Sequence, residues 1–350
     1  MSGKKVGFDC RYIKPDSQDG ISRFSSELFN ALSKDHHLTA IISDQRQLEA
    51  LPEGVRYLSI QKPTSLLEPL SALRLNREGF DVIFSPMQTI GSFGKKFKLV
   101  LTVHDLIYYS HPKPPGYFNP LIRILWRLYH TSFWPQKLLL SAADEVVTVS
   151  HTTKDALLKN RLTNKPITVV YNAPSQIPIV QAQTKRKIVY MGSFMPYKNV
   201  EDLIEAVADL PDYKLILLSK INQKDRQRLQ SLADQWNAKV EFENGVTDET
   251  YADHLASATA LVHASSDEGF GIPIIEAMSV GCPVVCSDIP IFREIAGEEG
   301  LFFNIGDKRQ LIEQIQVAAE TREQRKADLM ERASSFSWDK SAENLARLLF

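Results

Sequence analysis

Short runs of consecutive hydrophobic residues alternate along almost the whole chain with longer segments that have the period of an amphipathic helix. In segment 20–34, for example, one helical face would carry Ile21, Phe24, Leu28, Phe29 and Leu32. Strands that are hydrophobic at nearly every position are typically buried on both faces, as in parallel sheets covered by helices. The pattern therefore predicts an α/β fold with parallel sheets.

The predicted strands form two series, one in each half of the chain. The first series comprises segments 5–10, 38–43, 81–86, 98–105 and 143–150. The second comprises segments 186–193, 213–220, 239–245, 259–265, 282–288 and 300–304. A chain of 350 residues is longer than one hydrophobic core usually serves. We therefore predict two doubly wound, Rossmann-like domains, 1–173 and 174–335, joined where Pro174 and Pro178 interrupt the alternation.

Ligands of doubly wound sheets bind beyond the carboxyl ends of the strands, so the residues that follow each predicted strand are candidates for chemistry. With two such domains, we expect the ligand site in the cleft between them. One strand exit has an unusual composition. The stretch "SSDEGFGIPIIEAMSVGCPVVCSD", residues 265–288, places Glu268 and Glu276 on either side of two glycines and a proline.

The segment "PIIEAMSV", 273–280, is predicted to be a short helix. Pro273 suits a first helical turn, where its missing N–H is no loss, and Gly281 suits a left-handed residue after the helix. Glu276 would then lie one turn into the helix, where the positive end of the helix dipole stabilises its ionised form. Glu268 would stay on the preceding loop, and we expect both carboxylates to face one ligand.

The glycines of this exit suit an anion. Without Cβ atoms at Gly269 and Gly271, the backbone N–H groups of Phe270, Gly271 and Ile272 could approach a phosphate directly. A carboxylate accepts two hydrogen bonds and so suits a diol such as that of a ribose or a hexose. A ligand with hydroxyls at both ends and phosphate in the middle fits the pattern, and this describes a nucleotide sugar.

These residues carry a resemblance to a known family. "EGFGIPIIE" resembles the E-x7-E signature of the family-4 retaining glycosyltransferases, which have two Rossmann-like domains, the GT-B fold. The chain is similar to the family at five further segments: "DGISRFSSEL" to its Gly-rich acceptor-side loop, "LTVHDLIYYSHP" to T-x-H-D-L, "ADEVVTVSHTTKDAL" to A-D-x-x-x-T-V-S, "VYMGSFMPYKN" to G-S-x-x-P-R-K-N, and "FSWDKSAENL" to its terminal helix. The loops most resemble those of the GDP-mannose-using branch. In the family the last helix, here 336–350, often returns to the first domain.

The resemblance implies that the C-terminal domain binds the donor. Lys198 would hold the charge of the diphosphate leaving group, and Glu276 would bind the ribose hydroxyls. Glu268 would contact the sugar ring and stabilise positive charge at the anomeric carbon, without acting as a covalent nucleophile. The implied donor-binding set is Ser193, Lys198, Val246, Glu268, Gly269, Phe270, Gly271, Ile272 and Glu276.

Two positions depart from the family pattern. Ser193 stands where many relatives have an arginine after the glycine that corresponds to Gly192, and Tyr197 replaces the arginine usual before the lysine. The first change removes a fixed positive charge that could stabilise the departing diphosphate. A catalytically weak nucleotide-sugar-binding protein therefore stays open as an alternative.

The resemblance also implies an acceptor side in the N-terminal domain. His104, at the exit of "KLVLTV", 98–103, would face the transferred sugar and complete a catalytic set with Glu268 and Lys198. Asp105 is expected to cap or orient. Gly20, Ile21 and Ser150 would lie beside the acceptor.

Composition narrows the remaining possibilities. A net charge of −1 gives no electrostatic footprint for nucleic acid. Cys10, Cys282 and Cys286 form a sparse, odd set typical of reduced thiols in the cytoplasm. No D-x-D motif is present, and the GT-B scheme uses helix ends and a lysine, so we expect no cofactor and no essential metal. Neither a signal peptide nor a run of eighteen apolar residues is apparent.

Segment 116–140 mixes large apolar residues with Arg123, Arg127, His130 and Lys137. One interpretation is an interfacial helix, bounded by Pro120 and Pro135, that docks on anionic lipid at the inner face of the membrane and delivers a lipid-linked acceptor. The other is an ordinary packing helix.

The sequence thus predicts a retaining glycosyltransferase that moves a hexose, mannose from GDP-mannose in the first instance, to a glycan or lipid-linked glycan. A UDP-sugar donor is the first alternative. A two-domain dehydrogenase is disfavoured because no G-x-G-x-x-G follows the first strand.

Overall fold

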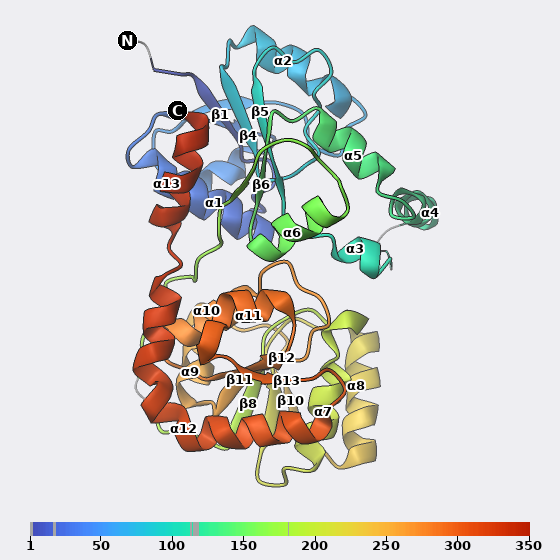
Figure 1. Cartoon of the computed structure of the whole chain (residues 1–350), viewed down its shortest axis with the longest axis vertical. Coiled ribbons are helices and arrows are strands. Elements are labelled where there is room, and N and C mark those ends of the chain that lie inside the picture. The colour runs from blue at the N-terminus through green and yellow to red at the C-terminus, as the bar shows by residue number, and fades with distance from the viewer. Residues whose placement is uncertain (1–2, 17–18, 113, 115–118, 181) are drawn as a thin grey trace. The chain divides into compact units, whose positions relative to one another are not determined.

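The computed structural model describes residues 3–16, 19–112, 114, 119–180 and 182–350. The chain divides into two compact units (Figure 1). The N-terminal unit contains Met1–Asn172 and, after a long excursion of the chain, Ser337–Phe350. The C-terminal unit contains Ala173–Phe336. Each unit is built around one parallel sheet, as the hydrophobic runs predict.

The N-terminal unit has a seven-stranded parallel sheet in the order β3-β2-β1-β4-β5-β6-β7. Its strands are β1 Val6–Asp9, β2 Leu38–Ile42, β3 Arg56–Ser59, β4 Val82–Ser85, β5 Lys98–Val103, β6 Glu145–Thr148 and β7 Ile167–Val169. Strand β1 lies between β2 and β4, and the strands follow one another along the chain in opposite directions on its two sides. Val6 of β1 pairs with Leu38 of β2 and with Val82 of β4. All four residues of β1 are buried, which explains why its sequence has no polar side chain before Asp9.

Helices cover this sheet. They are α1 Gly20–Ser33, α2 Ser71–Arg77, α3 Ile107–Ser110, α4 Pro120–Tyr129, α5 Trp134–Ser141, α6 His151–Lys159 and α13 Trp338–Leu349, with 3₁₀ turns η1 Gln45–Ala50 and η2 Glu68–Leu70. Helix α13 packs against α1, where the rings of Trp338 and Phe24 lie 6.1 Å apart. The last helix thus belongs to the core of the first unit (Figure 1).

The C-terminal unit has a six-stranded parallel sheet in the order β10-β9-β8-β11-β12-β13. Its strands are β8 Lys187–Tyr190, β9 Lys214–Leu217, β10 Val240–Phe242, β11 Ala260–His263, β12 Val284–Ser287 and β13 Leu301–Phe303. Its helices are α7 Val200–Ala208, α8 Gln223–Trp236, α9 Asp248–Ser257, α10 Ile272–Ser279, α11 Pro290–Ala296 and α12 Lys308–Ser334, with the 3₁₀ turns η3 Pro196–Lys198 and η4 Gly297–Glu299.

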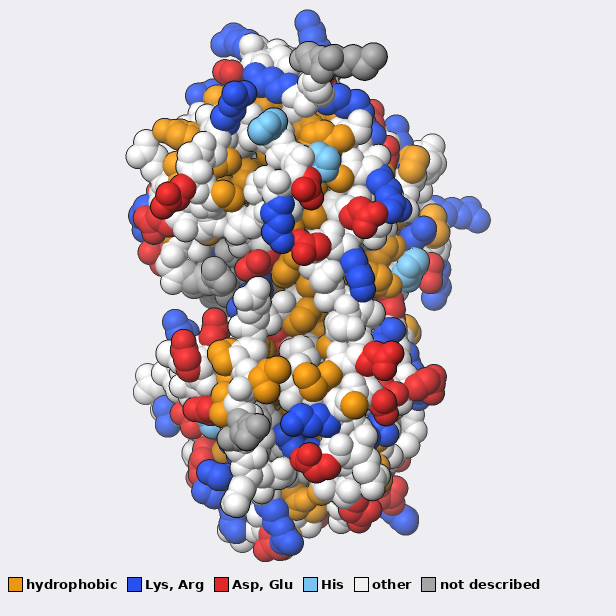
Figure 2. Space-filling view, turned by 90° about the vertical axis from the view of Figure 1, so that its left-hand side faces the viewer, with side chains coloured by type: hydrophobic (Ala, Val, Ile, Leu, Met, Phe, Trp, Pro, Cys, Tyr) orange, Lys and Arg blue, Asp and Glu red, His pale blue; other side chains and the backbone are white. Residues whose placement is uncertain are grey.

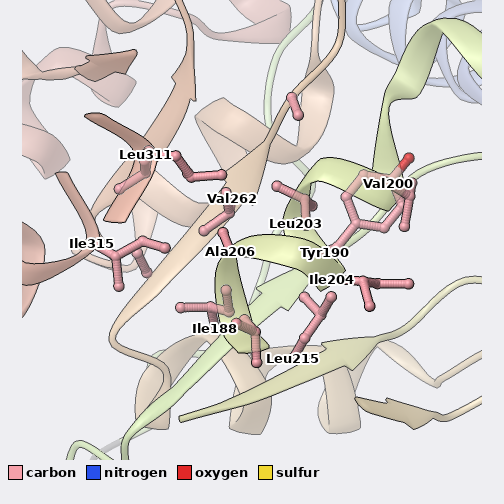
Figure 3. Close-up of a cluster of buried hydrophobic side chains, with 14 of the residues drawn as sticks. Ile188, Tyr190, Val200, Leu203, Ile204, Ala206, Leu215, Val262, Leu311 and Ile315 are labelled. Carbon is pink, nitrogen blue, oxygen red and sulfur yellow. The ribbon is translucent and has the colours of Figure 1, made fainter. Parts of the chain in front are cut away.

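The core of the C-terminal unit lies between the sheet and the helices beside it. Figure 3 shows Ile204 of α7 and Ile315 of α12 together with Ile188 and Val262 of the central strands. All four side chains are fully buried. The cluster fixes β8 and β11 as neighbours, and this pairing brings their exit loops together.

One helix was predicted between Pro120 and Pro135, and the structure has α4 there, beginning at Pro120 as predicted. Helix α4 ends at Tyr129, and α5 begins at Trp134 with Pro135 in its first turn. A proline tolerates that position but cannot continue a helix from upstream, because it has no N–H and its ring clashes with an earlier carbonyl. The predicted helix is therefore present but ends at Tyr129, before Pro135, and segment 116–140 also contains a second helix, α5, that was not predicted. Residues 116–118 of the predicted segment lie outside the described residues.

Surface charge is mixed on the face shown in Figure 2. Basic and acidic side chains are interspersed there, with apolar side chains between them. On that face neither sign forms the continuous stripe that a nucleic-acid footprint has. Within the described part of the chain, none of the helices combines the length and the apolar character needed to span a bilayer.

Candidate functional site

The loops that leave β8 and β11 are tied to each other. Ser266 N–H donates to the Tyr197 carbonyl at 2.8 Å, and Asn199 Nδ2 donates to the Ala264 carbonyl at 2.9 Å. Asn199 has a left-handed backbone (φ +47°) at the start of α7, a conformation that asparagine tolerates better than most residues. The two exits are therefore held as one structure at the carboxyl edge of the sheet.

Lys198 and Glu268 form an ion pair across these two loops. Their side chains are only 10% and 11% exposed. Ser265 Oγ donates to the same Glu268 oxygen, Oε1, at 3.0 Å, and Lys198 Nζ lies 5.2 Å from the centre of the Tyr197 ring. The pair joins a cation and an acid that the sequence assigned to one ligand.

Gly192 is required by the packing beneath this pair. A Cβ atom at Gly192 would lie 2.7 Å from the Tyr190 hydroxyl, closer than van der Waals contact allows. That hydroxyl donates to the Ser193 carbonyl at 2.5 Å, so the buried tyrosine holds the loop in place from below. Gly192 N–H in turn donates to Ser219 Oγ at 2.9 Å. The exposed Ser193 is thus anchored through its backbone, not its side chain.

His263, the last residue of β11, lies in the same region and is buried. Its ring is 5.0 Å from that of Tyr190 and 6.1 Å from that of Phe292. Neither ring nitrogen has a hydrogen bond of good geometry. Burial lowers the pKa of His263 to about 4, and the nearby Glu268 only partly opposes this effect. The imidazole is therefore neutral at physiological pH.

Helix α10 follows the Glu268 loop and has the local structure that the sequence predicts. Gly271 is left-handed (φ +92°), Pro273 lies in the first turn, and Gly281 is left-handed (φ +72°) after the last turn. Glu276 points inward: it is 4% exposed, and its Oε1 accepts from Ser175 Oγ at 2.8 Å. Ser175 was not predicted, because a serine in a proline-rich linker carries no motif.

The other predicted donor residues follow β11 and β10. Gly269 and Phe270 belong to the β11–α10 connection, and Ile272 is the first residue of α10. Phe270 is buried with its ring 5.9 Å from that of Phe336. Val246 lies in the loop between β10 and α9 and is partly buried. The structure joins Lys198 directly to Glu268 and holds Glu276 by a separate contact.

In the N-terminal unit, His104 follows β5 directly. Its Nε2 donates to the Pro86 carbonyl at 2.8 Å, and its ring stands edge-on to that of Phe24 at 5.1 Å. Burial lowers the pKa of His104 below its usual value. With the proton on Nε2, Nδ1 of the neutral ring is a hydrogen-bond acceptor.

The remaining acceptor-side residues lie at helix starts. Ser150 is buried and caps α6 by accepting from Thr153 N–H at 3.0 Å, while Thr153 Oγ1 donates to the His104 carbonyl at 3.1 Å. Gly20 and Ile21 form the first turn of α1, which Asp19 caps. Asp105 accepts from the N–H of Ile107 at 3.0 Å, which makes it an orienting residue of its own loop.

A buried ion network at the exit of β1 escaped the sequence analysis. Arg11 donates from Nε and Nη2 to Asp9 at 2.8 and 3.0 Å, and from Nη1 and Nη2 to Glu68 at 2.7 and 2.8 Å. Nη1 also donates to the Gln61 carbonyl at 3.1 Å. The signal was available, since charged residues directly after a buried strand are unusual, but Glu68 is distant in sequence and matches no motif.

Among the residues described, no cluster of three or more His, Cys, Asp or Glu side chains could hold a metal ion. All three cysteines are buried free thiols.

Comparisons with known proteins bear on the family and the fold of the chain. Residues 175–334 match the family model for glycosyl transferases group 1, and residues 18–173 match that for glycosyltransferase family 4. The HepE protein of Anabaena, solved in complex with UDP and glucose, has a similar fold, with a TM-score of 0.73 over 99% of both chains at 19% identity. The chain therefore has the GT-B fold of glycosyltransferases, as predicted.

The family follows from the two matched models and from curated relatives. The chain is 28% identical to the O-antigen chain mannosyltransferase RfbU of Salmonella typhimurium, over 84% of this chain and 85% of that protein. It is 27% identical to the O-antigen chain mannosyltransferase B of Escherichia coli, over 69% and 67%. The chain belongs to the family-4 glycosyltransferases and is a glycosyltransferase, which confirms the prediction of both family and enzyme class.

Proposed function

We propose that this glycosyltransferase transfers mannose, with retention of configuration, from GDP-mannose to a glycan or lipid-linked glycan. The observation that carries the proposal is the Lys198–Glu268 pair, held by two neighbouring strand exits beside the start of α10. The relatives named as O-antigen mannosyltransferases support mannose as the sugar and a glycan as the acceptor.

The donor would be held by charge and by paired hydrogen bonds. Lys198 has three N–H donors, and Glu268 is its one ion-pair partner among the described residues, so its ammonium can turn to an entering diphosphate. Glu268 would then be released toward the sugar, where a carboxylate stabilises positive charge at the anomeric carbon. Glu276 would bind the ribose diol. This division gives each acid a separate target.

The acceptor would be positioned by the N-terminal unit. His104 is neutral, and its Nδ1 can accept a hydrogen bond from a sugar or acceptor hydroxyl. Gly20, Ile21 and Ser150 would lie along the acceptor path. Domain closure around both substrates would exclude water and limit hydrolysis of the donor.

We further infer that no metal ion is essential, since Lys198 and the start of α10 would stabilise the leaving diphosphate. The enzyme would work in the cytoplasm at the inner face of the membrane, with α4 and α5 as the peripheral contact. The mixture of exposed leucine and isoleucine with arginine on α4 supports that contact.

A UDP-sugar is the second candidate donor, because the similarly folded HepE was solved with UDP and glucose. Thermal unfolding of the purified protein with GDP-mannose, UDP-glucose and UDP-galactose separates the two. A ligand at about a hundred times its Kd stabilises the native state by about 2.7 kcal/mol.

The expected result is a raised midpoint with GDP-mannose, followed by slow release of GDP that EDTA does not change. A larger shift with a UDP-sugar would replace the donor assignment. Binding without any turnover, even with acceptor glycans present, would instead favour a nucleotide-sugar-binding protein that lacks activity.

A further inference from the structure

A cavity of about 430 Å³ opens between α5 and the end of α6 in the N-terminal unit. His104 and Ser150 lie at the opposite, N-terminal end of α6, so this cavity is separate from the predicted acceptor side. Its lining is polar and apolar and comes from Lys137, Ser141, Leu158 and the run 161–164.

The lining favours an anion. It contains two cations and no acid, and the Thr163 hydroxyl and Asn164 amide beside them can donate further hydrogen bonds, whereas Ser141 Oγ already donates to the Leu138 carbonyl at 2.7 Å. Within the described part of the chain, neither Lys137 nor Arg161 makes an ion pair or a side-chain hydrogen bond with another residue. A guanidinium paired with an ammonium is well matched to phosphate oxygens, because the guanidinium fork can bind two of them at once.

The backbone at Arg161 is a second, independent observation. Arg161 has φ +51°, in the left-handed region, at the end of α6. Leu162 N–H donates to the Leu157 carbonyl and Arg161 N–H to the Leu158 carbonyl, both at 3.0 Å, which is a Schellman-type helix end. Glycine usually occupies this position, and another residue costs about 1 kcal/mol there. The chain accepts that cost at the residue whose side chain lines the cavity.

An apolar face lies beside the cavity. On α5, Gln136 and Leu140 point inward and are buried, Lys137 and Ser141 line the cavity, and Trp134 and Leu138 project outward. Trp134 is 68% exposed and Leu138 is 56% exposed.

Helix α4 also exposes apolar side chains, since Ile124, Leu125 and Leu128 are each more than half exposed. Tyr129 at its end bonds Gln136 of α5 at 3.3 Å, so the two helices are held together. Exposed apolar residues beside unpaired cations are typical of a surface that lies in a lipid headgroup layer.

We propose that this cavity binds the phosphate of an anionic phospholipid headgroup, with Arg161 and Lys137 as its ligands and the outer faces of α4 and α5 in the adjoining apolar layer. The site rests on the membrane contact within the proposed function and is independent of the donor sugar. It would turn general attraction to a membrane into a defined orientation on it.

The test is co-sedimentation of the full chain with phosphatidylcholine vesicles, with and without phosphatidylglycerol. The matched variants are Arg161→Gly, Lys137→Gln and, as control, Lys159→Gln, which removes a charge from the same helix end without touching the cavity. General attraction is worth about 1 kcal/mol per basic residue, or roughly fivefold. We expect Arg161→Gly and Lys137→Gln to lower the partition coefficient onto phosphatidylglycerol vesicles by more than tenfold and the control by fivefold or less.

Arg161→Gly also separates binding from folding. Glycine relieves the left-handed backbone, so the thermal midpoint of this variant should be unchanged or higher while vesicle binding is lost. Equal losses of vesicle binding in Arg161→Gly and Lys159→Gln would overturn the site. A lower thermal midpoint of Arg161→Gly with normal vesicle binding would also overturn it, because Arg161 would then serve only the helix end.

Failure of the membrane contact itself would look different. If the wild-type protein ignores phosphatidylglycerol vesicles, both the contact and the site are refuted. If Leu128→Asp abolishes binding while Arg161→Gly does not, the contact stands without the site. The thermal shift with GDP-mannose should be the same in Arg161→Gly as in the wild type. A missing shift in both proteins would count against the donor assignment and not against the lipid site.

Discussion

Both units place a buried ion pair at the carboxyl edge of their sheet, but the two pairs differ in how completely they are satisfied. All five N–H donors of Arg11 are matched by Asp9, Glu68 and the Gln61 carbonyl. Lys198 meets one carboxylate and the face of one ring. A guanidinium with no donor left can bind nothing further, whereas the ammonium keeps capacity for a ligand. Burial at a strand exit alone therefore does not identify a binding residue.

The Arg11 network instead organises the loops around it. Ser71 Oγ and Gly91 N–H both donate to Glu68, at 2.9 and 3.2 Å, and Ser85 Oγ donates to Asp9 at 3.2 Å. Gly91 is needed there because a Cβ atom would lie 1.7 Å from the Glu68 carbonyl oxygen. The carbonyl of Pro86, the next residue after Ser85, accepts the hydrogen bond from Nε2 that fixes the tautomer of His104.

The largest effect should come from removing the satisfied cation. Arg11→Met would leave Asp9 and Glu68 buried without their partner, and breaking a buried pair in this way costs about 3–5 kcal/mol. Chemical denaturation followed by circular dichroism measures the loss. Arg46→Met is the matched control: it breaks exposed pairs with Asp44 and Asp16, each worth about 1 kcal/mol at most.

If Arg11→Met does not fold, Arg11→Lys keeps the charge and loses the fork. It should fold with an intermediate loss of stability. An Arg11→Met protein as stable as the wild type would show that the network is not what holds these loops.

Removing the unsatisfied cation should affect catalysis more than folding. Lys198→Ala is expected to lower kcat/KM for sugar transfer on the order of 10²–10³-fold, about 2.7–4 kcal/mol of transition-state stabilisation. Single-turnover transfer from GDP-mannose measures it, with circular dichroism to confirm the fold. Lys214→Ala serves as control because Lys214 also pairs with a glutamate, Glu241, but on an exposed surface. Normal transfer by Lys198→Ala would remove Lys198 from the mechanism.

The smallest predicted effect is a dependence of folding stability on pH that comes from His263 in the C-terminal unit. Because burial lowers the pKa of His263 to about 4, the unfolded chain, with a histidine pKa near 6.5, binds the proton more readily. Stability is therefore lost as pH falls through the window from 6.5 to 4, by about 2 kcal/mol between pH 7.5 and pH 5. Denaturation of wild type and His263→Leu at both pH values tests this. The variant should lose about 2 kcal/mol less on acidification, and an identical loss would mean that His263 is already hydrated.

The sequence predicted the architecture because its signals are local and redundant. Continuous apolar strands specify parallel sheets, and Pro273 with Gly281 bounds α10 with little ambiguity. The resemblance to family 4 rested on motifs spread over both halves and is confirmed. The roles assigned to Lys198, Glu268 and Glu276 stay predictions, although the first two meet in one ion pair.

Other features could not be predicted because their partners are far apart in sequence. Arg11 finds Glu68 only once β1 is central in the sheet and η2 lies beside its exit. Ser175 meets Glu276, 101 residues away, through a linker without a pattern. The break between α4 and α5 was missed for a different reason: Pro135 was taken as the end of a helix, whereas it lies in the first turn of the next one.

The placement of α13 has a consequence for biosynthesis. The ribosome delivers nearly all of the first unit early, but the helix that covers Phe24 arrives only after Ala173–Phe336 has been made. Until then the part of α1 around Phe24 lacks its cover by α13, and this apolar surface of the nascent first unit is open to chaperones and to wrong partners. The second unit is one uninterrupted stretch and can mature ahead of the first, so assembly would run opposite to the direction of synthesis.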